Sequence, residues 1–256
     1  MTPTTHSREP LRLADMTWGE VRELAPPWIA VLPIGAIEAH GPHLPLATDC
    51  IIAEAMAEAG AGRLARSRAS VVLLPTLSYT PAPFAAGFAG TVSVPADAVR
   101  EVVESVAEAV ADAGAAAMAI ANAHLDPAHV ACLRNATATI VAAGRISVAF
   151  PDVTRRRLAD RLTEEFRSGA CHAGRYEGSI VMAARPDLVR ASIAGSLPPN
   201  PASLVDAIEE GHTTFEAAGG PRAYFGWPSD ASAEEGRRTI EILGDMLAEA
   251  IDEALT

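Results

Sequence analysis

Short apolar segments alternate with longer amphipathic segments along the first 150 residues, and this order constrains the fold more than any other feature. The apolar segments have the length and composition of buried strands, while the segments between them place apolar residues at helical spacing. The predicted strands cover residues 28–35, 70–77, 115–121 and 145–151, and the predicted helices cover 50–67, 96–114 and 127–144. Strands that alternate with helices form parallel sheets covered on both faces, so we expect an α/β fold.

The second part of the chain is less regular. The predicted segments are a charged surface helix at 153–169, a short helix at 179–189, a loop-rich stretch at 190–230 and a long terminal helix at 231–255. Gly236 and Gly244 either interrupt the terminal helix or are tolerated by it. Because no linker and no internal repeat separate these segments, we expect residues 1–256 to form a single domain, with a flexible tail at residues 1–14.

Polar loops follow two of the predicted strands. The loop GAIEAHGPHLPLATD (35–49) begins at the end of the first strand, and NAHLDP (122–127) follows the strand at 115–121. In open α/β sheets, ligands bind outside the carboxyl ends of the strands, so we expect these two loops to converge on one site. A third polar stretch, CHAGRYEGS (171–179), contributes further groups of the same kind.

These three stretches carry the carboxylates and imidazoles that bind divalent metal ions. The groups are Glu38, His40 and Asp49, then His124 and Asp126, then His172 and Glu177. A set that mixes oxygen and nitrogen donors suits zinc, manganese or iron(II) rather than calcium. Such groups can hold two metal ions with a bridging carboxylate, and a two-metal site with a bridging hydroxide hydrolyses amide bonds.

Some of these side chains also have purely structural interpretations. Asp49 lies just before a helical run and is placed to act as its N-cap. Glu177 is placed to act as a first-turn residue near the helix dipole. His43 either orients a metal ligand or binds substrate, whereas His129 lies inside a predicted helix and is expected to be a hydrogen-bonding group.

Composition excludes several other classes of function. The formal net charge is −12, and an acidic surface repels both nucleic acids and anionic membranes. All twenty basic residues are arginine, which excludes Schiff-base chemistry and Walker-type phosphate loops because both need lysine. The three scattered cysteines argue against a disulfide framework. Because the chain has neither a signal-peptide pattern nor an apolar run long enough to span a membrane, we expect a cytoplasmic protein.

The motifs resemble those of the creatininase family in the same order along the chain. The resemblance rests on LPIGAIEAHGPHLPLATD (32–49), FAGTVSV (88–94), NAHLDP (122–127), HAGRYEGS (172–179) and DASAEEGRR (230–238). The first of these is similar to the family signature Glu-x-His-Gly-x-His-Leu-Pro followed by an aspartate, which is a specific pattern.

The resemblance implies a three-layer α/β/α fold with a mostly parallel central sheet, and a homo-oligomer, often a hexamer. It implies two divalent metal ions, zinc in the first place, with manganese or iron as alternatives. The ligands that it implies are Glu38, His40, Asp49 and His124, with Asp49 bridging. His172 is then the general acid/base that shuttles a proton to the leaving nitrogen.

For the remaining ligand, the resemblance leaves two candidates. Creatininase itself has a glutamate two residues after the motif histidine, and Asp126 stands there in this chain. Family members that lack this carboxylate have a glutamate that matches Glu177. We keep both residues, Glu177 as a metal ligand and Asp126 as a catalytic group.

The polar residues that the family uses around its substrate are replaced here. Residues 81–91 read PAPFAAGFAGT, and LDP replaces the usual Gly-Gly-Asn after the motif histidine. The predicted substrate-binding residues are His43, Phe84, Phe88 and Tyr176. The sequence therefore predicts a metal-dependent hydrolase of a C–N bond in a small amide, lactam or short peptide with an apolar part. Lyase or cyclase chemistry, or a non-hydrolytic metal-binding relative, is the alternative.

Overall fold

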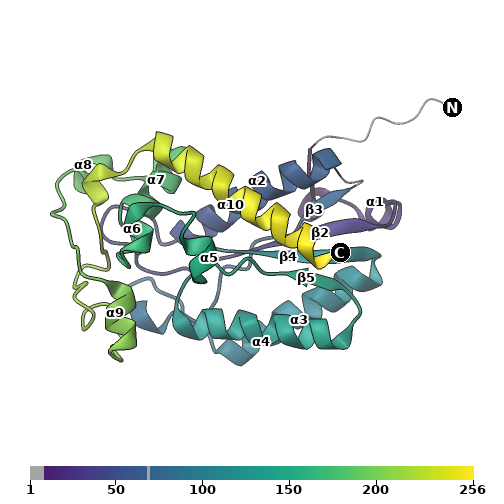
Figure 1. Cartoon of the computed structure of the whole chain (residues 1–256), viewed down its shortest axis with the longest axis horizontal. Helices are drawn as coiled ribbons and strands as arrows, with labels where there is room; N and C mark the ends of the chain where they lie inside the picture. The colour runs from purple at the N-terminus through teal and green to yellow at the C-terminus, as the bar shows by residue number, and fades with distance from the viewer. Residues whose placement is uncertain (1–8, 68–69) are drawn as a thin grey trace.

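The computed structural model describes residues 9–67 and 70–256, and its centre is a five-stranded parallel sheet (Figure 1). The strand order is β1-β3-β2-β4-β5, with β1 at Leu11–Arg12, β3 at Val71–Leu73, β2 at Trp28–Ile34, β4 at Ala115–Asn122 and β5 at Ser147–Ala149. The predicted fold class is confirmed, because the four apolar segments form neighbouring parallel strands and the segments between them form helices.

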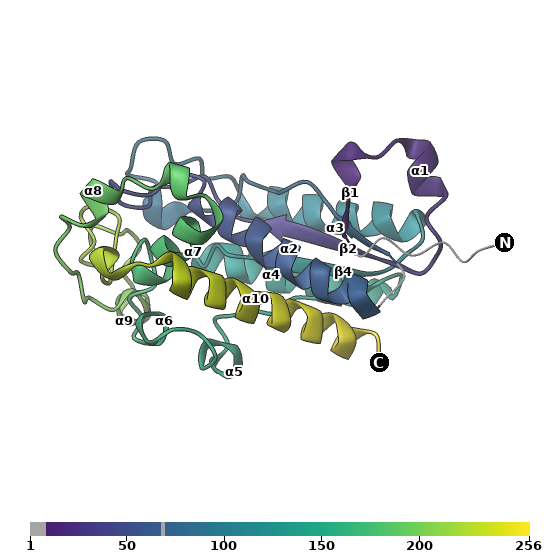
Figure 2. The same ribbon diagram turned by 90° about the horizontal axis from the view of Figure 1, so that it is seen from above.

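Two layers of helices cover the sheet, as Figures 1 and 2 show from two directions. One layer consists of α2 (Thr48–Ser67), α7 (Arg175–Ala184) and α10 (Ala233–Ala254), and the other of α3 (Ala96–Asp112) and α4 (Pro127–Ala143). Within the described ranges, 9–67 and 70–256, none of the helices combines the length and the apolar character that crossing a membrane requires.

The sequence of β2 explains why both faces are covered. All seven residues of the strand are buried. Ile29 and Val31 belong to the hydrophobic cluster formed with α2, α7 and α10, whereas Ala30 and Leu32 belong to the cluster formed with α3 and α4. Alternate side chains of a strand point to opposite faces, so a continuous apolar strand needs a helical layer on each side.

The amino-terminal stretch differs in part from the predicted tail. Leu11–Arg12 form the edge strand β1, which pairs in parallel with β3 and was not predicted, because two residues carry no periodicity. They are followed by the 3-10 turn η1 (Leu13–Asp15) and by α1 (Trp18–Arg22). Residues 1–8 of the predicted tail lie outside the described residues.

The prediction of a single charged helix at 153–169 is wrong. The structure has two short helices there, α5 (Arg156–Ala159) and α6 (Glu164–Arg167). Thr163 starts the second helix as its N-cap, since its hydroxyl accepts the backbone N–H of Phe166. Glu165 is also buried rather than solvated.

The remaining segments connect the core elements at one end of the sheet. They include the 3-10 turns η2 (Pro83–Ala85), η3 (Pro186–Leu188) and η4 (Pro228–Asp230) and the short helices α8 (Ala191–Ala194) and α9 (Leu204–Glu209). The helix predicted at 179–189 starts earlier, at Arg175, and ends at Ala184 before Pro186. In Figure 1, α6, α7, α8 and α9 gather at the left, at the end of the sheet where α4 also begins.

The terminal helix α10 runs without interruption through both of its glycines, which bring it close to neighbouring helices. A Cβ at Gly236 would overlap the backbone carbonyl oxygen of Ser179 in α7, and a Cβ at Gly244 would lie 2.6 Å from the Cβ of Ala59 in α2. The absence of side chains at these two positions therefore allows α10 to pack directly against α7 and α2.

We expect Gly236→Ala to lower the free energy of unfolding by about 2 kcal/mol, because the added methyl group would push α10 away from α7. Gly62→Ala in α2 is the matched control, since nothing lies within 4 Å of a Cβ there. By helix propensity alone, this control should be neutral or stabilising by up to about 1 kcal/mol. Urea denaturation gives the free energy of unfolding of both variants, and equal changes in the two would contradict the argument that α10 packs closely at Gly236.

Candidate metal centre

The loop between β2 and α2 carries Glu38, and it is folded back on itself at the carboxyl end of β2. The backbone N–H of Glu38 donates to Leu46 O at 3.0 Å, and that of Ala39 donates to the Thr91 hydroxyl at 3.1 Å. At Gly35, a Cβ would lie 2.5 Å from the backbone of α2, so only glycine lets the helix start against the strand end. These contacts hold the polar side chains of the loop beside the first turn of α2.

The structure brings six of the predicted site residues into one buried cluster. Their potential ligand atoms form three overlapping groups, each within 4.8 Å: Glu38, Asp49 and His124; His40, Asp49 and Glu177; and Glu38, His40 and His172. All six side chains are buried. Asp49 takes part in two of the groups, through Oδ1 near one imidazole and Oδ2 near another.

His40 is fixed in a tautomer whose free nitrogen faces carboxylates. Its Nδ1 lies 3.1 Å from the backbone carbonyl of Glu38, and because a carbonyl only accepts, Nδ1 must carry the hydrogen. In the neutral ring, Nε2 then presents a lone pair to Asp49 Oδ1 at 3.1 Å and to Glu177 Oε2 at 3.6 Å. Two acceptors this close need a proton or a metal ion between them.

His124 has the same arrangement with the ring nitrogens exchanged. Its Nε2 donates to the backbone carbonyl of Pro81 at 2.8 Å, which leaves the lone pair on Nδ1. This atom faces Asp49 Oδ2 at 3.0 Å and Glu38 Oε1 at 3.2 Å. The other oxygen of Glu38, Oε2, is buried without a hydrogen-bond partner. Nitrogen lone pairs, carboxylates and an unpaired buried oxygen in one place fit divalent metal ions.

Electrostatics show that protons occupy this cluster when metal ions do not. Burial lowers the pKa of His40, but Asp49 and Glu177 outweigh it and raise that pKa to about 10. In His124, burial is likewise outweighed by Glu38 and Asp49, so the pKa lies well above its ordinary value. Burial raises the pKa of Glu177 to about 8, whereas the neighbouring imidazoles, against the effect of burial, lower that of Asp49. Metal ions therefore have to displace protons.

His172 lies beside the cluster with one nitrogen free. Its Nε2 donates to Ala39 O at 2.9 Å, and its Nδ1 lies 4.0 Å from Glu38 Oε1. The ring stands between those of His40 and Phe215, with centroid separations of 4.3 and 4.2 Å. Burial, together with the charge on His40, lowers the pKa of His172 well below its ordinary value, so its Nδ1 is an unprotonated base at neutral pH.

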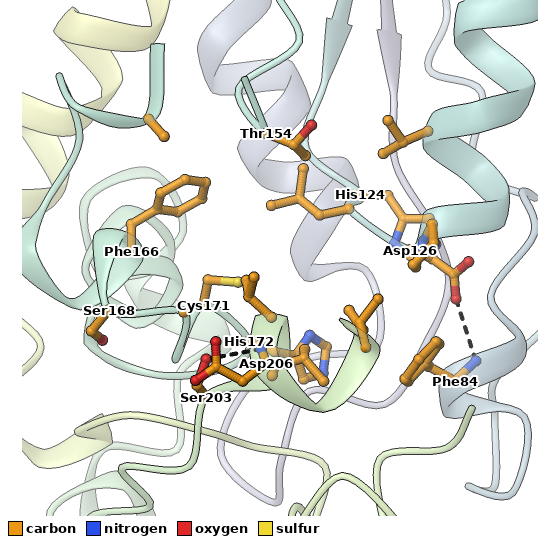
Figure 3. A pocket seen from close by; sticks show the side chains of 18 of the residues that line it. Phe84, His124, Asp126, Thr154, Phe166, Ser168, Cys171, His172, Ser203 and Asp206 are labelled. Carbon is orange, nitrogen blue, oxygen red and sulfur yellow. Dashed lines mark hydrogen bonds between the residues drawn. The ribbon is translucent and has the colours of Figure 1, made fainter. Parts of the chain in front are cut away.

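Asp126 is in none of the three groups formed by the described residues. Its Oδ1 accepts the N–H of Ala128 at 2.8 Å, which makes Asp126 the N-cap of α4, and its Oδ2 accepts the N–H of Phe84 at 3.3 Å. Figure 3 shows the carboxylate directed toward Phe84. Both oxygens thus serve backbone donors.

A cavity of about 900 Å³ opens onto the cluster (Figure 3). Its walls near the cluster are apolar and come from Phe84, Leu125, Val130, Phe166, Leu204 and Phe215. Exposed charged side chains form its rim: Arg134, Arg156, Arg167, Asp160, Asp206 and Glu209. A molecule bound in this cavity would meet potential metal ligands at one end, an apolar surface beside them and charges at the entrance.

The predicted substrate-binding residues divide into two sets. Phe84 lines the cavity, whereas His43, Phe88 and Tyr176 do not. His43 is buried against Tyr224, and burial lowers its pKa to about 4. Phe88 and Tyr176 support the site from behind, since Phe88 packs on Phe215 and Tyr176 packs on Phe166.

Sequence reasoning missed Phe215, which contacts His172 and forms a cavity wall. It lies in the loop-rich stretch 190–230, where no periodic pattern points to a buried aromatic. His129, by contrast, has the predicted role: its Nε2 lies 2.9 Å from the side-chain oxygen of Asn122, which also accepts the backbone N–H of His124 at 3.3 Å. This network holds the loop that carries His124.

The chain is similar to known proteins along almost its whole length. The family model described as "Creatininase: Creatinine amidohydrolase" matches residues 14–251. The mycofactocin precursor peptide peptidase of Mycobacterium ulcerans (strain Agy99) is 30% identical over 263 positions, covering 100% of this chain and 94% of that protein. Its counterpart in Mycobacterium tuberculosis (strain CDC 1551 / Oshkosh) is 28% identical, covering 96% and 93%. The solved structure of creatinine amidohydrolase (creatininase) superposes with a TM-score of 0.74 at 22% identity, covering 96% of this chain and 98% of that chain.

We expect Zn²⁺ binding to tighten as pH rises through about 7 to 10, because ligands must be deprotonated to bind a metal ion. The raised pKa values of Glu177 (about 8) and His40 (about 10) mean that both carry protons below this range and release them when metal binds. Calorimetric titration in buffers of different ionisation enthalpy counts these protons. Binding with no proton release and no pH dependence would contradict the assignment of these ligands.

Proposed function

The chain belongs to the creatininase family of amidohydrolases, and we propose that it is a metal-dependent hydrolase of the C–N bond in a short peptide or peptide-like amide. One observation carries the metal dependence. His40 and His124 each donate one ring N–H to a backbone carbonyl and turn the other nitrogen toward carboxylates at 3.0 to 3.2 Å. This pairing is unfavourable for neutral rings unless a cation lies between the groups.

The proposed ligands fall into two sets that share one carboxylate. Glu38, Asp49 and His124 would hold one divalent ion, and His40, Asp49 and Glu177 would hold the second. Solved creatininases include one named for manganese and one described as a Zn-Zn type. The nitrogen and carboxylate donors of this chain suit zinc first, with manganese or iron as alternatives. When bound, such ions polarise a carbonyl group and lower the pKa of a shared water.

His172 would move the proton in this reaction. Its Nε2–H is committed to Ala39 O, so only Nδ1 is available, and that atom faces the cluster beside Glu38. Nδ1 carries no hydrogen in this tautomer, so it would be able to take a proton from a water molecule and deliver it to the departing nitrogen. Stacking between His40 and Phe215 holds the ring in the orientation that this transfer needs.

The cavity supports a substrate larger than one small lactam. Its volume of about 900 Å³ lies near the upper end of the range for ligand pockets, roughly 300–1,000 Å³. The apolar wall of Phe84, Phe166 and Phe215 suits an apolar side chain next to the scissile bond. The relatives at 28–30% identity are named as peptidases of a precursor peptide, which agrees with a peptide rather than a single ring.

Substitution of the two alternative carboxylates tests the proposal. We expect Glu177→Gln to reduce the bound metal from two ions to one per chain and to lower kcat/KM by about 100-fold or more, since removing a metal ligand is costly for both affinity and activity. Asp126→Asn should keep both ions and most activity, because asparagine caps a helix as well as aspartate does. It should lower the free energy of unfolding by about 1 kcal/mol at most, since the amide nitrogen cannot accept the N–H of Phe84.

Metal content is measured by mass spectrometry, and hydrolysis is measured on a library of short apolar peptides, with the metal-stripped protein as the baseline. Loss of one ion in Asp126→Asn, with both ions retained in Glu177→Gln, would reverse the ligand assignment. Full hydrolysis by the metal-stripped protein would contradict the proposed function itself.

A further inference from the structure

A buried carboxylate outside the metal cluster holds three backbone N–H groups. Glu165, in α6, is only 5% exposed. Its Oε1 accepts the N–H of Tyr176 at 2.7 Å, and its Oε2 accepts those of Arg175 at 2.9 Å and Trp227 at 2.7 Å. A buried carboxylate is costly unless its oxygens are well bonded, and here backbone donors from two separate segments provide the bonds.

Two glycines make room for this carboxylate. A Cβ at Gly174 would lie 2.5 Å from Glu165 Oε1, and a Cβ at Gly226 would overlap Oε2. Gly226 also has a φ of +84°, a conformation that glycine adopts without strain. Because Gly174 and Gly226 have no side chains, the backbone can approach the Glu165 carboxylate closely at both positions.

The segment that Glu165 holds is the start of α7. Gly174, the N-cap, has no side chain to satisfy the first N–H groups of the helix, and the Glu165 carboxylate takes this role for Arg175 and Tyr176. A negative charge here also interacts favourably with the positive end of the helix dipole. Glu165 thus caps α7 from another element of the fold.

The next residue of α7 is Glu177, a proposed ligand of the second metal ion. Its Oε2 accepts the N–H of Ala173 at 2.5 Å, so its direction depends on the backbone at 173–177. Immediately before, His172 accepts the N–H of Phe225 through its backbone oxygen at 2.8 Å. The capped first turn of α7 therefore lies between the proposed base, His172, and the proposed metal ligand, Glu177.

We propose that Glu165 is a positioning residue for the second metal ion: by fixing the first turn of α7, it sets the direction in which Glu177 presents its carboxylate to His40 and Asp49. This inference rests on the proposed function. The first ion provides an internal reference, because Glu38, Asp49 and His124 all lie outside α7. A residue that only stabilised the fold would affect both ions alike.

Glu165→Gln tests this inference. The substitution replaces one of the two accepting oxygens with an NH₂ group, so at least one backbone N–H loses its acceptor. We expect the affinity for the second Zn²⁺ to fall about 10- to 100-fold, as is usual when a group that orients a ligand is removed, with the first ion bound within about twofold of wild type. Glu164→Gln, at the exposed neighbour in the same helix, is the matched control and should leave both affinities unchanged. Glu165→Asp retains the charge and should restore part of the second affinity.

Stepwise Zn²⁺ titration against a competing chelator gives the two affinities for each full-length variant. Equal weakening of both ions in Glu165→Gln, or no weakening of the second, would overturn the inference while leaving the proposed function intact. If Glu165→Gln does not fold, Glu165→Asp is tested instead for selective weakening of the second Zn²⁺ site. If neither variant folds, Glu165 has a structural role only and the inference is overturned. A wild-type protein that binds fewer than two ions would overturn the assignment of two metal sites, and the inference with it, while metal-dependent hydrolysis would stand.

Discussion

The rest of the site depends on the contacts that the Asp49 carboxylate makes with two histidines. Its two oxygens lie 3.1 and 3.0 Å from nitrogens of His40 and His124, which come from loops after different strands. Each imidazole is fixed by a bond from its other nitrogen to a backbone carbonyl, so neither can turn away. The protein therefore holds lone pairs against carboxylates in a buried place, an arrangement that protons or metal ions must neutralise.

The fold provides the backbone that makes this arrangement rigid. β2 and β4 are parallel neighbours, so the loops after them leave the sheet at the same end. Gly35 lets α2 begin directly against the end of β2, which places Asp49 in its first turn beside the loop that carries Glu38. Because these loops start on buried strands, the ligand atoms are positioned by the core of the domain rather than by flexible surface segments.

The residues that could be predicted from sequence are those whose positions follow directly from strand ends. Glu38, His40 and His124 come within a few residues of two apolar strands, and parallel pairing brings them together. The choice between Asp126 and Glu177 could not be made in this way. Asp126 comes only two residues after His124 in the sequence, yet its carboxylate caps α4, whereas Glu177 reaches the cluster only through the packing of α7.

Phe215 and Glu165 show a further limit of sequence reasoning. Phe215 lies in a stretch with no periodicity, and its contact with His172 depends on how that stretch folds over the site. Glu165 lies in a run of charges typical of a solvated helix, but tertiary packing buries it between two glycine-containing turns. In both cases, partners distant in the chain determine the environment of the side chain.

Anomalous X-ray diffraction from crystals of the zinc-loaded protein is the most direct test of the central claim. We predict two peaks at the zinc edge, one bounded by Glu38, Asp49 and His124 and the other by His40, Asp49 and Glu177, with Asp49 contacting both. Asp126 should remain on the N-terminus of α4. A single peak, or a second ion held by Asp126 with Glu177 turned away, would contradict the account.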